Sequence, residues 1–290
     1  MAPTEVSPRN LPDLRRMQAI LSAILEHRGP GYAIHPGDLA FWAYHSDPQT
    51  DDAVSYWLDG DRGFVVLDAH EQQIAIFCMP DQSPIPLLEW ASGQLGPDAR
   101  LWYVSSEDKV LATDLEKAGY RDVGLDGPIF TRRLTAEDAA PRPPAGFTLR
   151  AMTGEEEADR RRRASHAAFK STMDPDQHLE RYLRFMRSPV YDPERDLVAV
   201  APDGTIASFM IWWPDASGIA QIEPMGTDPA FHRQGVGRAL IEFAFSRMRE
   251  AGMTEVRVIT DEHRQDAVAF YAAVGFTRVA DLRFWKHTAT

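Results

Sequence analysis

Two short segments of the chain, one near the end of each half, follow the same pattern. LEKAGYRDV occupies residues 115–123 and YAAVGFTRV occupies residues 271–279. In each, the end of a helical pattern is followed by a glycine, an aromatic residue and the start of a strand pattern. The repeat indicates an internal duplication with a long period. Two unrelated α/β domains that share this short pattern remain the alternative.

The clearest boundary between the halves is TAEDAAPRPPAG, residues 135–146. Its three prolines cannot lie in a helix interior or a central strand, so the segment is predicted to be a semi-rigid linker. A chain of 290 residues is also long enough for two domains of about 100–200 residues each. We therefore predict a domain at 1–136, a linker at 137–146 and a second domain at 147–290.

Composition limits the class of protein. The chain is 44% hydrophobic and 26% charged, which suits a folded core. No apolar run reaches the ~18 residues of a membrane helix, and the first residues lack the apolar stretch of a secretory signal. Cys78 is the only cysteine, which excludes an intramolecular disulfide and CxxC motifs. We expect a soluble cytoplasmic protein without metal, either a monomer or a homodimer.

The charge is unevenly distributed. The net charge is −12, and residues 1–145 hold 12 basic and 22 acidic side chains, against 19 and 21 in residues 146–290. Nucleic-acid binding needs clustered Lys and Arg, so this class of partner is not expected. An acidic first half suits a cationic partner, although solubility alone also accounts for the charge.

Hydrophobic periodicity predicts alternating helices and strands in both halves. In the first half, we expect helices at 11–28, 87–95 and 110–118 and strands at 64–68, 73–79, 101–105 and 130–134. In the second half, we expect helices at 155–169, 177–186, 236–251 and 267–274. The strands expected there are 147–152, 197–201, 206–212, 219–223, 256–260, 276–279 and 282–285.

The stretch QIEPMGTDPAFHRQGVGRAL, residues 221–240, carries the most specific chemical signal. A strand leads through a loop into a long helix, and unsatisfied N–H groups at a helix N-terminus attract anions. Gly235 and Gly237 let the backbone approach a phosphate closely, while Arg233 and Arg238 add positive charge. The dinucleotide GxGxxG pattern fails because residue 240 is Leu, and the Walker A pattern fails as well.

This stretch resembles the GNAT superfamily of acyl-CoA-dependent N-acyltransferases. HRQGVG at 232–237 resembles its pyrophosphate signature, and AVAFYAAVGF at 267–276 is similar to its later helical motif. The resemblance covers about residues 146–290. His232 stands where the family usually has Arg or Gln, and Arg264 stands where it often has Asn. The implied fold is mixed α/β: two GNAT-like domains in tandem, each with a mostly antiparallel sheet, a splayed central strand pair and flanking helices.

The resemblance also implies residue roles, with acetyl-CoA as the acyl donor. Tyr271 would protonate the departing thiolate, and a packed aromatic side chain is the alternative for it. Glu223 would assist removal of a proton from an amine, and a solvated or Arg-paired charge is its alternative. The implied cofactor-binding residues are Met225, Gly226, Thr227, His232, Arg233, Gln234, Gly235, Val236, Gly237 and Arg238.

Other polar and aromatic residues are given structural interpretations. Asp174 and Asp176 are expected to cap a helix rather than hold an amine with His178. The runs EEE at 155–157 and RRRR at 160–163 are expected to form ion pairs on a solvated helix face. One of Trp212 and Trp213 is expected in the core, with the other as a candidate for the wall of the acceptor cleft. Cys78 is expected to be a buried, inert thiol.

The first half has no phosphate loop. PDQSPIP, at 80–86, offers three prolines where amide donors would be needed, and Leu115 stands where Tyr would be required. We interpret this half as a degenerate copy. The predicted function is direct transfer of an acetyl group to an amine of a small, cationic acceptor. The alternatives are a non-catalytic acyl-CoA-binding regulatory module and an acetyltransferase acting on a protein or peptide amine.

Overall fold

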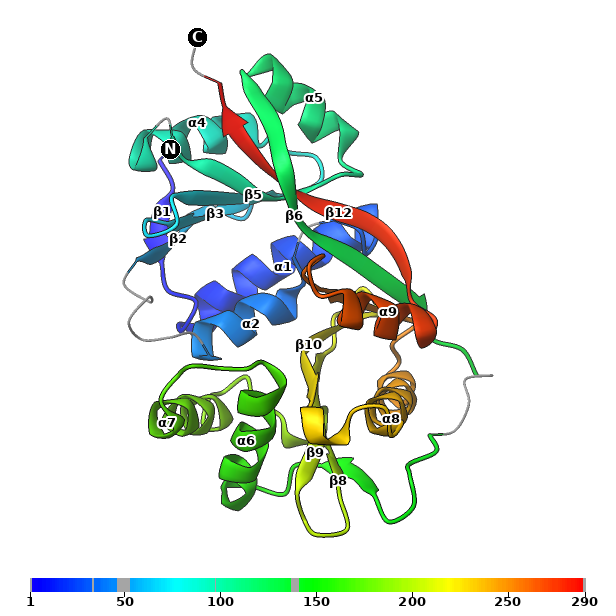
Figure 1. The fold of residues 1–290 in the computed structure, drawn as a ribbon. Helices are drawn as coiled ribbons and strands as arrows, with labels where there is room; N and C mark the ends of the chain where they lie inside the picture. Colours follow the sequence, from blue (N-terminus) through cyan, green and yellow to red (C-terminus); the bar gives the residue numbers. More distant parts are fainter. Residues whose placement is uncertain (1, 33, 46–52, 97, 137–140, 289–290) are drawn as a thin grey trace.

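A computed structural model describes residues 2–32, 34–45, 53–96, 98–136 and 141–288 (Figure 1). The first four residues of the predicted linker lie outside these ranges. The first half of the described chain contains β1 (Thr4–Val6), α1 (Leu11–Arg28), α2 (Pro36–His45), β2 (Val54–Asp59), β3 (Gly63–Asp68), β4 (Gln73–Cys78), α4 (Ile85–Leu95), β5 (Arg100–Ser105), α5 (Lys109–Lys117) and β6 (Tyr120–Arg133).

The second half repeats this order of strands and helices. It contains β7 (Thr148–Ala151), α6 (Ala158–Ala168), α7 (Pro175–Met186), β8 (Asp196–Val200), β9 (Ile206–Trp213), β10 (Ile219–Thr227), α8 (Val236–Glu250), β11 (Glu255–Ile259), α9 (Gln265–Ala273) and β12 (Thr277–His287). Short 3-10 helices at Glu155–Glu157, Pro193–Arg195 and Pro229–Phe231 lie in the connections. The matching order supports the predicted duplication.

The helices begin and end where local chemistry requires it. The side chain of Asn10 accepts a hydrogen bond from the backbone N–H of Asp13 at the start of α1, and Gly29, with φ of 88°, ends the helix. Asp174 caps α7 in the same way by accepting from the N–H groups of Asp176 and Gln177. The capping interpretation of Asp174 is therefore confirmed.

The strands of both halves join one 12-stranded sheet, with the order β1-β2-β3-β4-β5-β12-β6-β11-β10-β9-β8-β7. The two halves exchange their last strands: β12 inserts between β5 and β6, and β6 in turn pairs with β11. Figure 1 shows β6 and β12 running side by side from one half into the other. The mixed α/β fold is confirmed, but the sheet runs across the predicted domain boundary instead of ending at it.

Each half contains one parallel strand pair that separates after a few residues. β4 pairs with β5 only at Gln73 and Ile74, and β10 pairs with β11 only from Ile219 to Gln221. The other pairs of neighbouring strands in the described sheet are antiparallel. The predicted splayed central pair is therefore present in both halves.

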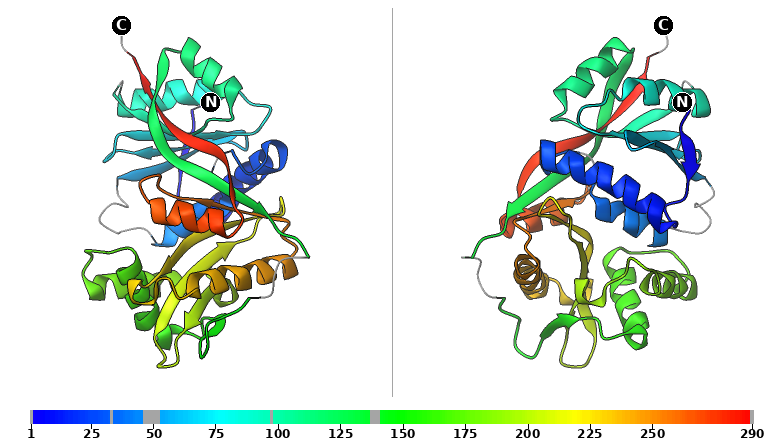
Figure 2. Two further views of the ribbon diagram at one scale, coloured as in Figure 1. Left: turned by 45° about the vertical axis from the view of Figure 1, so that its right-hand side comes forward. Right: turned by 180° about the vertical axis from the view of Figure 1, so that it is seen from behind.

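One hydrophobic core is shared by the two halves. Alternate residues of β9 face opposite sides of the sheet, so Met210 and Trp212 pack with α8 while Phe209, Ile211 and Trp213 pack on the other face. That other face forms one cluster with residues of α1, α2, β2, β3 and β4. The views in Figure 2 show α1 and α2 between the strands of the first half and the helices of the second.

Several elements differ from the sequence-based expectation. The strands expected at 276–279 and 282–285 are one continuous strand, β12, whose ladder with β6 contains register shifts. β6 begins at Tyr120, ten residues before the expected strand at 130–134, and it includes Gly124 and Pro128. β1, α2 and β2 were not predicted. Within the described ranges, no helix is long and apolar enough to cross a membrane.

Candidate active site

The loop between β10 and α8 ends in a left-handed backbone conformation that favours glycine. Gly235 has φ of 80° and caps α8, and no other atom lies within 4 Å of the position that a Cβ would take there. A Cβ on Gly237 would lie 2.8 Å from Thr227 Oγ1, so glycine is needed for α8 to approach β10. The loop thus leaves an open space in front of the N-terminal amides of α8.

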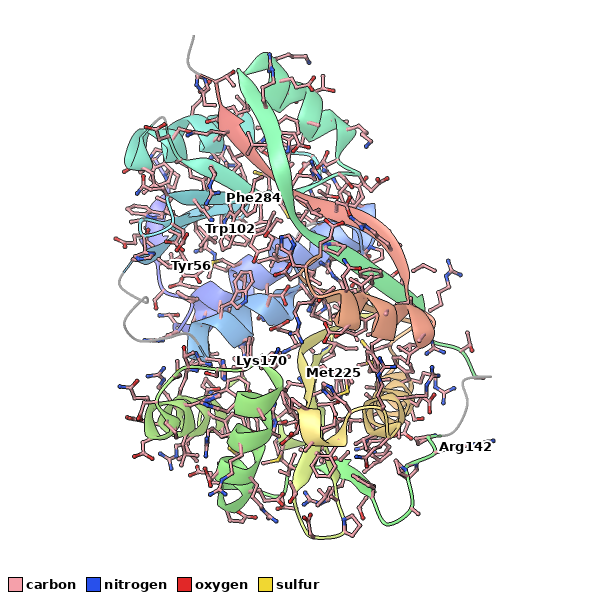
Figure 3. The ribbon with its side chains drawn as sticks, viewed as in Figure 1. Tyr56, Trp102, Arg142, Lys170, Met225 and Phe284 are labelled. Carbon is pink, nitrogen blue, oxygen red and sulfur yellow. The ribbon has the colours of Figure 1, made fainter. Side chains whose placement is uncertain are left out.

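The edge of β10 beside this loop has backbone groups that no strand uses. The N–H of Asp228 donates to Ala207 O, and Met225, Gly226 and Thr227 pair in register with β9. Because an antiparallel ladder alternates, Gly226 bonds to β9 while Met225 and Thr227 direct their N–H and C=O groups to the opposite, splayed side. Figure 3 shows Met225 on β10, between α6 and α8.

Polar contacts fix the loop against its surroundings. His232 Nε2 lies 3.0 Å from Thr227 O, and Gln234 Nε2 donates to Ala230 O at 3.2 Å. Arg238 bonds to Ala273 O at 2.7 Å and so links α8 to α9. Arg233, with φ of 62°, makes no hydrogen bond or ion pair within the described part of the chain. Val236 is buried, so only its backbone is placed to contact a ligand.

Glu223 lies where β10 bulges away from β9. The register between these strands shifts between Ile222 and Met225, and Trp213 Nε1 donates to the backbone oxygen of Glu223 at 2.9 Å. Burial, and then the charge of Asp38, raise the pKa of the Glu223 carboxyl to about 8. A carboxyl with this pKa exchanges protons near neutral pH, as a general base must.

The first half contributes a buried carboxyl to this site that sequence reasoning missed. Asp38, on α2, accepts a hydrogen bond from His35 N at 2.8 Å and faces the charge of Arg257 on β11. Burial raises the pKa of Asp38 to about 6, although Arg257 and the His35 hydrogen bond oppose this rise. The signal available in the sequence was an aspartate inside PGDLAFWAYH, an otherwise apolar segment.

Tyr271 lies on α9 and is nearly buried, with ring contacts to Phe270 and Phe276. Burial, and then the charge of Glu223, raise its pKa above the ordinary value, while Arg264 opposes the shift. The structure therefore brings Tyr271 and Glu223 into electrostatic contact, and the phenol keeps its proton at neutral pH. Arg264 lies 5.7 Å from the ring centroid of Phe169.

A cavity of about 230 Å³ opens beside Glu223, between α2 of the first half and α6, α7, β9 and β10 of the second. Polar and basic residues outnumber apolar ones in its lining. The lining residues are Phe41, His45, Arg161, Arg162, Ser165, Phe169, Ser171, His178, Arg181, Tyr182, Ile211, Glu223 and Pro224.

The expectation of a solvated face on α6 is wrong for two of its four arginines. Arg161 and Arg162 are buried, with 3% and 9% of their surface exposed, and both line the cavity. Glu157 is buried as well and pairs with Arg150 and Arg160. The spacing of charges in the sequence predicted the ion pairs of α6. It did not reveal that Tyr182 of α7 and Phe209 of β9 would cover Arg161 on one face of this helix.

The remaining predicted residues have structural positions. His178 lines the cavity, and burial followed by nearby arginines lowers its pKa to about 4. Trp212 and Trp213 are both buried, on opposite faces of β9. Cys78 is only partly buried, which differs from the expectation, but burial still raises the pKa of its thiol to about 12, in agreement with an inert thiol. The described residues contain no cluster of His, Cys, Asp and Glu able to hold a metal ion.

The equivalent places in the first half are different. α4 begins after Pro84, without a side-chain cap, and has a further proline in its first turn. Leu115, on α5, stands at the position that corresponds to Tyr271 on α9. It is fully buried and packs with Tyr120 and Trp285. At these described positions, the first half has neither an open glycine loop nor a phenol.

Comparison of the sequence with known proteins identifies acetyltransferases as relatives. The model of the Acetyltransferase (GNAT) family matches residues 160–276. A mycothiol acetyltransferase of Salinispora tropica is 30% identical over 200 residues, which is 67% of this chain and 60% of that protein. The chain therefore spans less than two thirds of the length of this relative. An aminoglycoside N(6')-acetyltransferase type 1 of Klebsiella aerogenes is 32% identical over 117 residues, which is 38% of this chain and 77% of that protein.

Solved structures share the fold over the whole chain. A tandem GNAT protein from the clavulanic acid biosynthesis pathway has a TM-score of 0.66 at 15% identity and covers 99% of both chains. A GNAT-family acetyltransferase from Colwellia psychrerythraea also reaches 0.66, at 13% identity, over 99% of this chain and 100% of that one. The open loop, the splayed strand, the family match and the aminoglycoside acetyltransferase relative together establish that the chain belongs to the acetyltransferase (GNAT) family.

Proposed function

We propose that the chain is an N-acetyltransferase that takes its acetyl group from acetyl-CoA and passes it directly to the amine of a small molecule. The observation that carries the proposal is the splayed edge of β10. This strand carries Glu223, which lines the cavity, and it leads into the glycine loop at the start of α8. The names of the mycothiol and aminoglycoside acetyltransferase relatives support an amine acceptor.

The residues present fit acetyl-CoA. The N-terminal amides of α8 and the loop backbone at Gly235 would bind its pyrophosphate. The outward N–H and C=O groups of Met225 and the outward N–H of Thr227 would pair with the amides of its pantetheine arm, as an added strand does. The bound thioester would supply an activated acetyl group, and the N–H groups of the bulged strand would polarise its carbonyl.

Two side chains would handle the protons. Glu223 would accept a proton from the attacking amine, directly or through water, as the new C–N bond forms. Tyr271 would donate its proton to the sulfur as the C–S bond breaks, and its raised pKa keeps that proton available at neutral pH. The products are the acetylated amine and the free thiol of coenzyme A.

Calorimetric titration with acetyl-CoA tests the cofactor loop. We expect one site per chain, and we expect Gly235→Glu to weaken binding roughly tenfold or more, because a carboxylate would occupy the space in front of the α8 amides. Gly252→Glu is the matched control. Gly252 lies just beyond the other end of α8, has φ of 85°, and likewise has no atom within 4 Å of its Cβ position.

Equal losses of affinity in the two variants, or no binding by the unaltered chain at millimolar acetyl-CoA, would contradict the proposal.

Thiol release is then measured with a panel of amines, with Tyr271→Phe as the second variant. An enzyme should lose turnover in this variant while it keeps its affinity for acetyl-CoA. Binding without turnover on any amine would instead favour a regulatory module.

A further inference from the structure

The cavity beside Glu223 is lined by cations, although the chain as a whole is acidic. Among the described residues, its lining includes three arginines (Arg161, Arg162 and Arg181) and one carboxyl, that of Glu223. The carboxylates that pair with two of these arginines, Asp196 and Asp159, are not part of the lining. The acids therefore lie behind the arginines, and the cationic groups border the cavity.

Arg161 is held rigidly with donors to spare. Its Nε lies 3.3 Å from Asp196 Oδ1, and its guanidinium lies 3.7 Å from the ring centroid of Phe209. Asp196 is itself fixed by the hydroxyls of Tyr182 and Tyr191. A guanidinium has five N–H donors, and within the described chain only the Nε of Arg161 has a hydrogen-bond partner. Its two Nη groups are thus available to a ligand.

Arg162 presents a second guanidinium from the same helix. Its Nε and Nη2 both bond to one oxygen of Asp159, at 3.2 and 2.5 Å, so Nη1 retains its donors. The next residue, Arg163, also pairs with Asp159 but is 71% exposed at its side chain and does not line the cavity. Asp159 thus holds one arginine toward the cavity and one toward solvent.

The other basic groups of the lining are neutral at pH 7. Burial followed by the charges of Arg181 and Arg161 lowers the pKa of His45 well below its usual value. Burial also lowers the pKa of His178, and Arg181, His166, Arg162 and Arg161 add to the shift. Both histidines therefore sense the same positive potential, which comes from α6 and α7.

We propose that the acceptor of this site is an amine that also carries an anionic group, a carboxylate or a phosphate, and that Arg161 and Arg162 bind this group while its amine faces Glu223. This inference rests on the proposed function, whose acceptor class it narrows. Arginine suits both anions because its planar donors bind their oxygens in pairs.

The size of the cavity points to a small acceptor. Its volume of about 230 Å³ is below the roughly 300–1,000 Å³ of most ligand pockets. Such a space suits a compact molecule with an amine at one end and an anion at the other. The cationic acceptor expected from the acidity of the first half would instead place positive charge against the arginines.

Matched pairs of acceptors test the inference through thiol release. Amino acids from glycine to glutamate are compared with their amides, which removes the carboxylate. O-phosphoethanolamine is compared with ethanolamine, and the amide of O-phosphoserine with serinamide, which isolates the phosphate. We expect the anionic member of at least one series to have a kcat/KM at least tenfold higher, and the series that shows it identifies the anion. Equal or higher values for the neutral and cationic members would overturn the inference while leaving the acetyltransferase proposal intact.

Arg162→Gln and Arg163→Gln form a matched pair of variants, since both arginines pair with Asp159. We expect Arg162→Gln to reduce the preference for the anionic acceptor roughly tenfold, as expected for the loss of one charge-assisted hydrogen bond, mainly through KM. Arg163→Gln should keep the full preference. An equal effect of both variants would also overturn the inference.

A binding measurement separates this inference from the acetyltransferase proposal. The chain is saturated with acetyl-CoA, which occupies the phosphate-binding loop, and its Tm is then measured with added inorganic phosphate or acetate at constant ionic strength. We expect a rise in Tm for the unaltered chain and for Arg163→Gln, and a smaller rise for Arg162→Gln. No rise with either anion would overturn the inference even if amines are acetylated. A rise without turnover on any amine would support the anion site and contradict the acetyltransferase.

Discussion

At the scale of single residues, the site depends on a carboxyl whose pKa lies above neutral pH. Glu223 lies at a bulge where Trp213 donates to its backbone oxygen, and its half-buried carboxyl also interacts with the charge of Asp38. Both influences favour the protonated form, so its pKa rises to about 8. The form that can accept a proton from an amine therefore becomes more abundant as the pH rises.

The first prediction concerns the pH dependence of acetyl transfer. We expect kcat/KM to rise with pH, to reach half of its plateau near pH 8 and to level off about one pH unit higher, because only ionised Glu223 can act as a base. Glu223→Gln should lower kcat/KM by about 10²–10⁴-fold and remove this ionisation from the profile. Rates of thiol release between pH 5.5 and 9.5 check it. The same pH profile in both proteins would exclude Glu223 as the base.

A second prediction uses Asp38, whose charge raises the pKa of Glu223. In Asp38→Asn, this charge is lost while the side-chain oxygen can still accept the hydrogen bond from His35 N. Glu223 should then ionise at lower pH, so the rise in kcat/KM should move to lower pH. The measurement is the profile of the Asp38→Asn variant, with circular dichroism as the control for folding. If kcat/KM of the variant rises at the same pH as in the unaltered chain, or at higher pH, the two carboxyls do not interact as proposed.

At the scale of elements, α2 is the helix that joins the first half to the site, and sequence reasoning missed it. PGDLAFWAYH is buried along most of its length, so it lacks the polar face that reveals an amphipathic helix. By contrast, α1, α7 and α8 have such faces, and their predicted bounds agree with the structure to within about two residues. α2 brings Phe41 and His45 to the cavity and Asp38 to Glu223.

The rest of the site divides in the same way between local and distant contacts. The loop residues from His232 to Gly237 could be predicted because glycine spacing and the start of a helix are local properties of the chain. The buried positions of Arg161 and Arg162 could not, because they depend on β9 and α7 covering one face of α6. The sequence shows which residues can pair but not how deeply the pairs are buried.

The third prediction tests the contact of α2 with β9. A Cβ on Gly37 would lie 2.3 Å from Trp213 Cβ, and both atoms are fixed by the backbone. Gly37→Ala should therefore lower the free energy of unfolding by about 1–3 kcal/mol. It should also raise the KM for the acceptor, because α2 must shift, and leave the affinity for acetyl-CoA nearly unchanged.

Gly93→Ala is the control for this change. Gly93 lies in α4, and no atom is within 4 Å of its Cβ position, so alanine should be neutral there or stabilise by up to about 1 kcal/mol. Urea unfolding of both variants supplies the comparison. A Gly37→Ala protein as stable as the unaltered chain would mean that α2 is not held against Trp213.

At the scale of the whole molecule, the two halves are duplicated in the order of their elements but are not independent in their packing. They share one sheet through β6 and β12, and one core cluster contains side chains from both. In addition, Nε2 of His35 in the first half lies 3.0 Å from the backbone oxygen of Ile219 in the second half. Sequence reasoning predicted the repeat, but long-range strand exchange leaves no local pattern that could reveal it.

The fourth prediction is that the chain unfolds in one transition. Since separation of the halves would open the shared core and break the β5–β12 and β6–β11 ladders, neither half should unfold alone. Differential scanning calorimetry should give one peak whose calorimetric and van't Hoff enthalpies agree. Two peaks that respond separately to Gly37→Ala would show that the halves are stable on their own.

The strand exchange also determines when the molecule can be completed during synthesis. β5 leaves the ribosome early, but the strand that covers its edge, β12, is made about 180 residues later. At roughly 5–20 residues per second, the nascent first half waits on the order of 10–40 s with an uncovered sheet edge. An open edge invites pairing with other chains. The growing polypeptide is therefore most exposed to misassembly before translation ends, which is when holding chaperones should matter most for its yield.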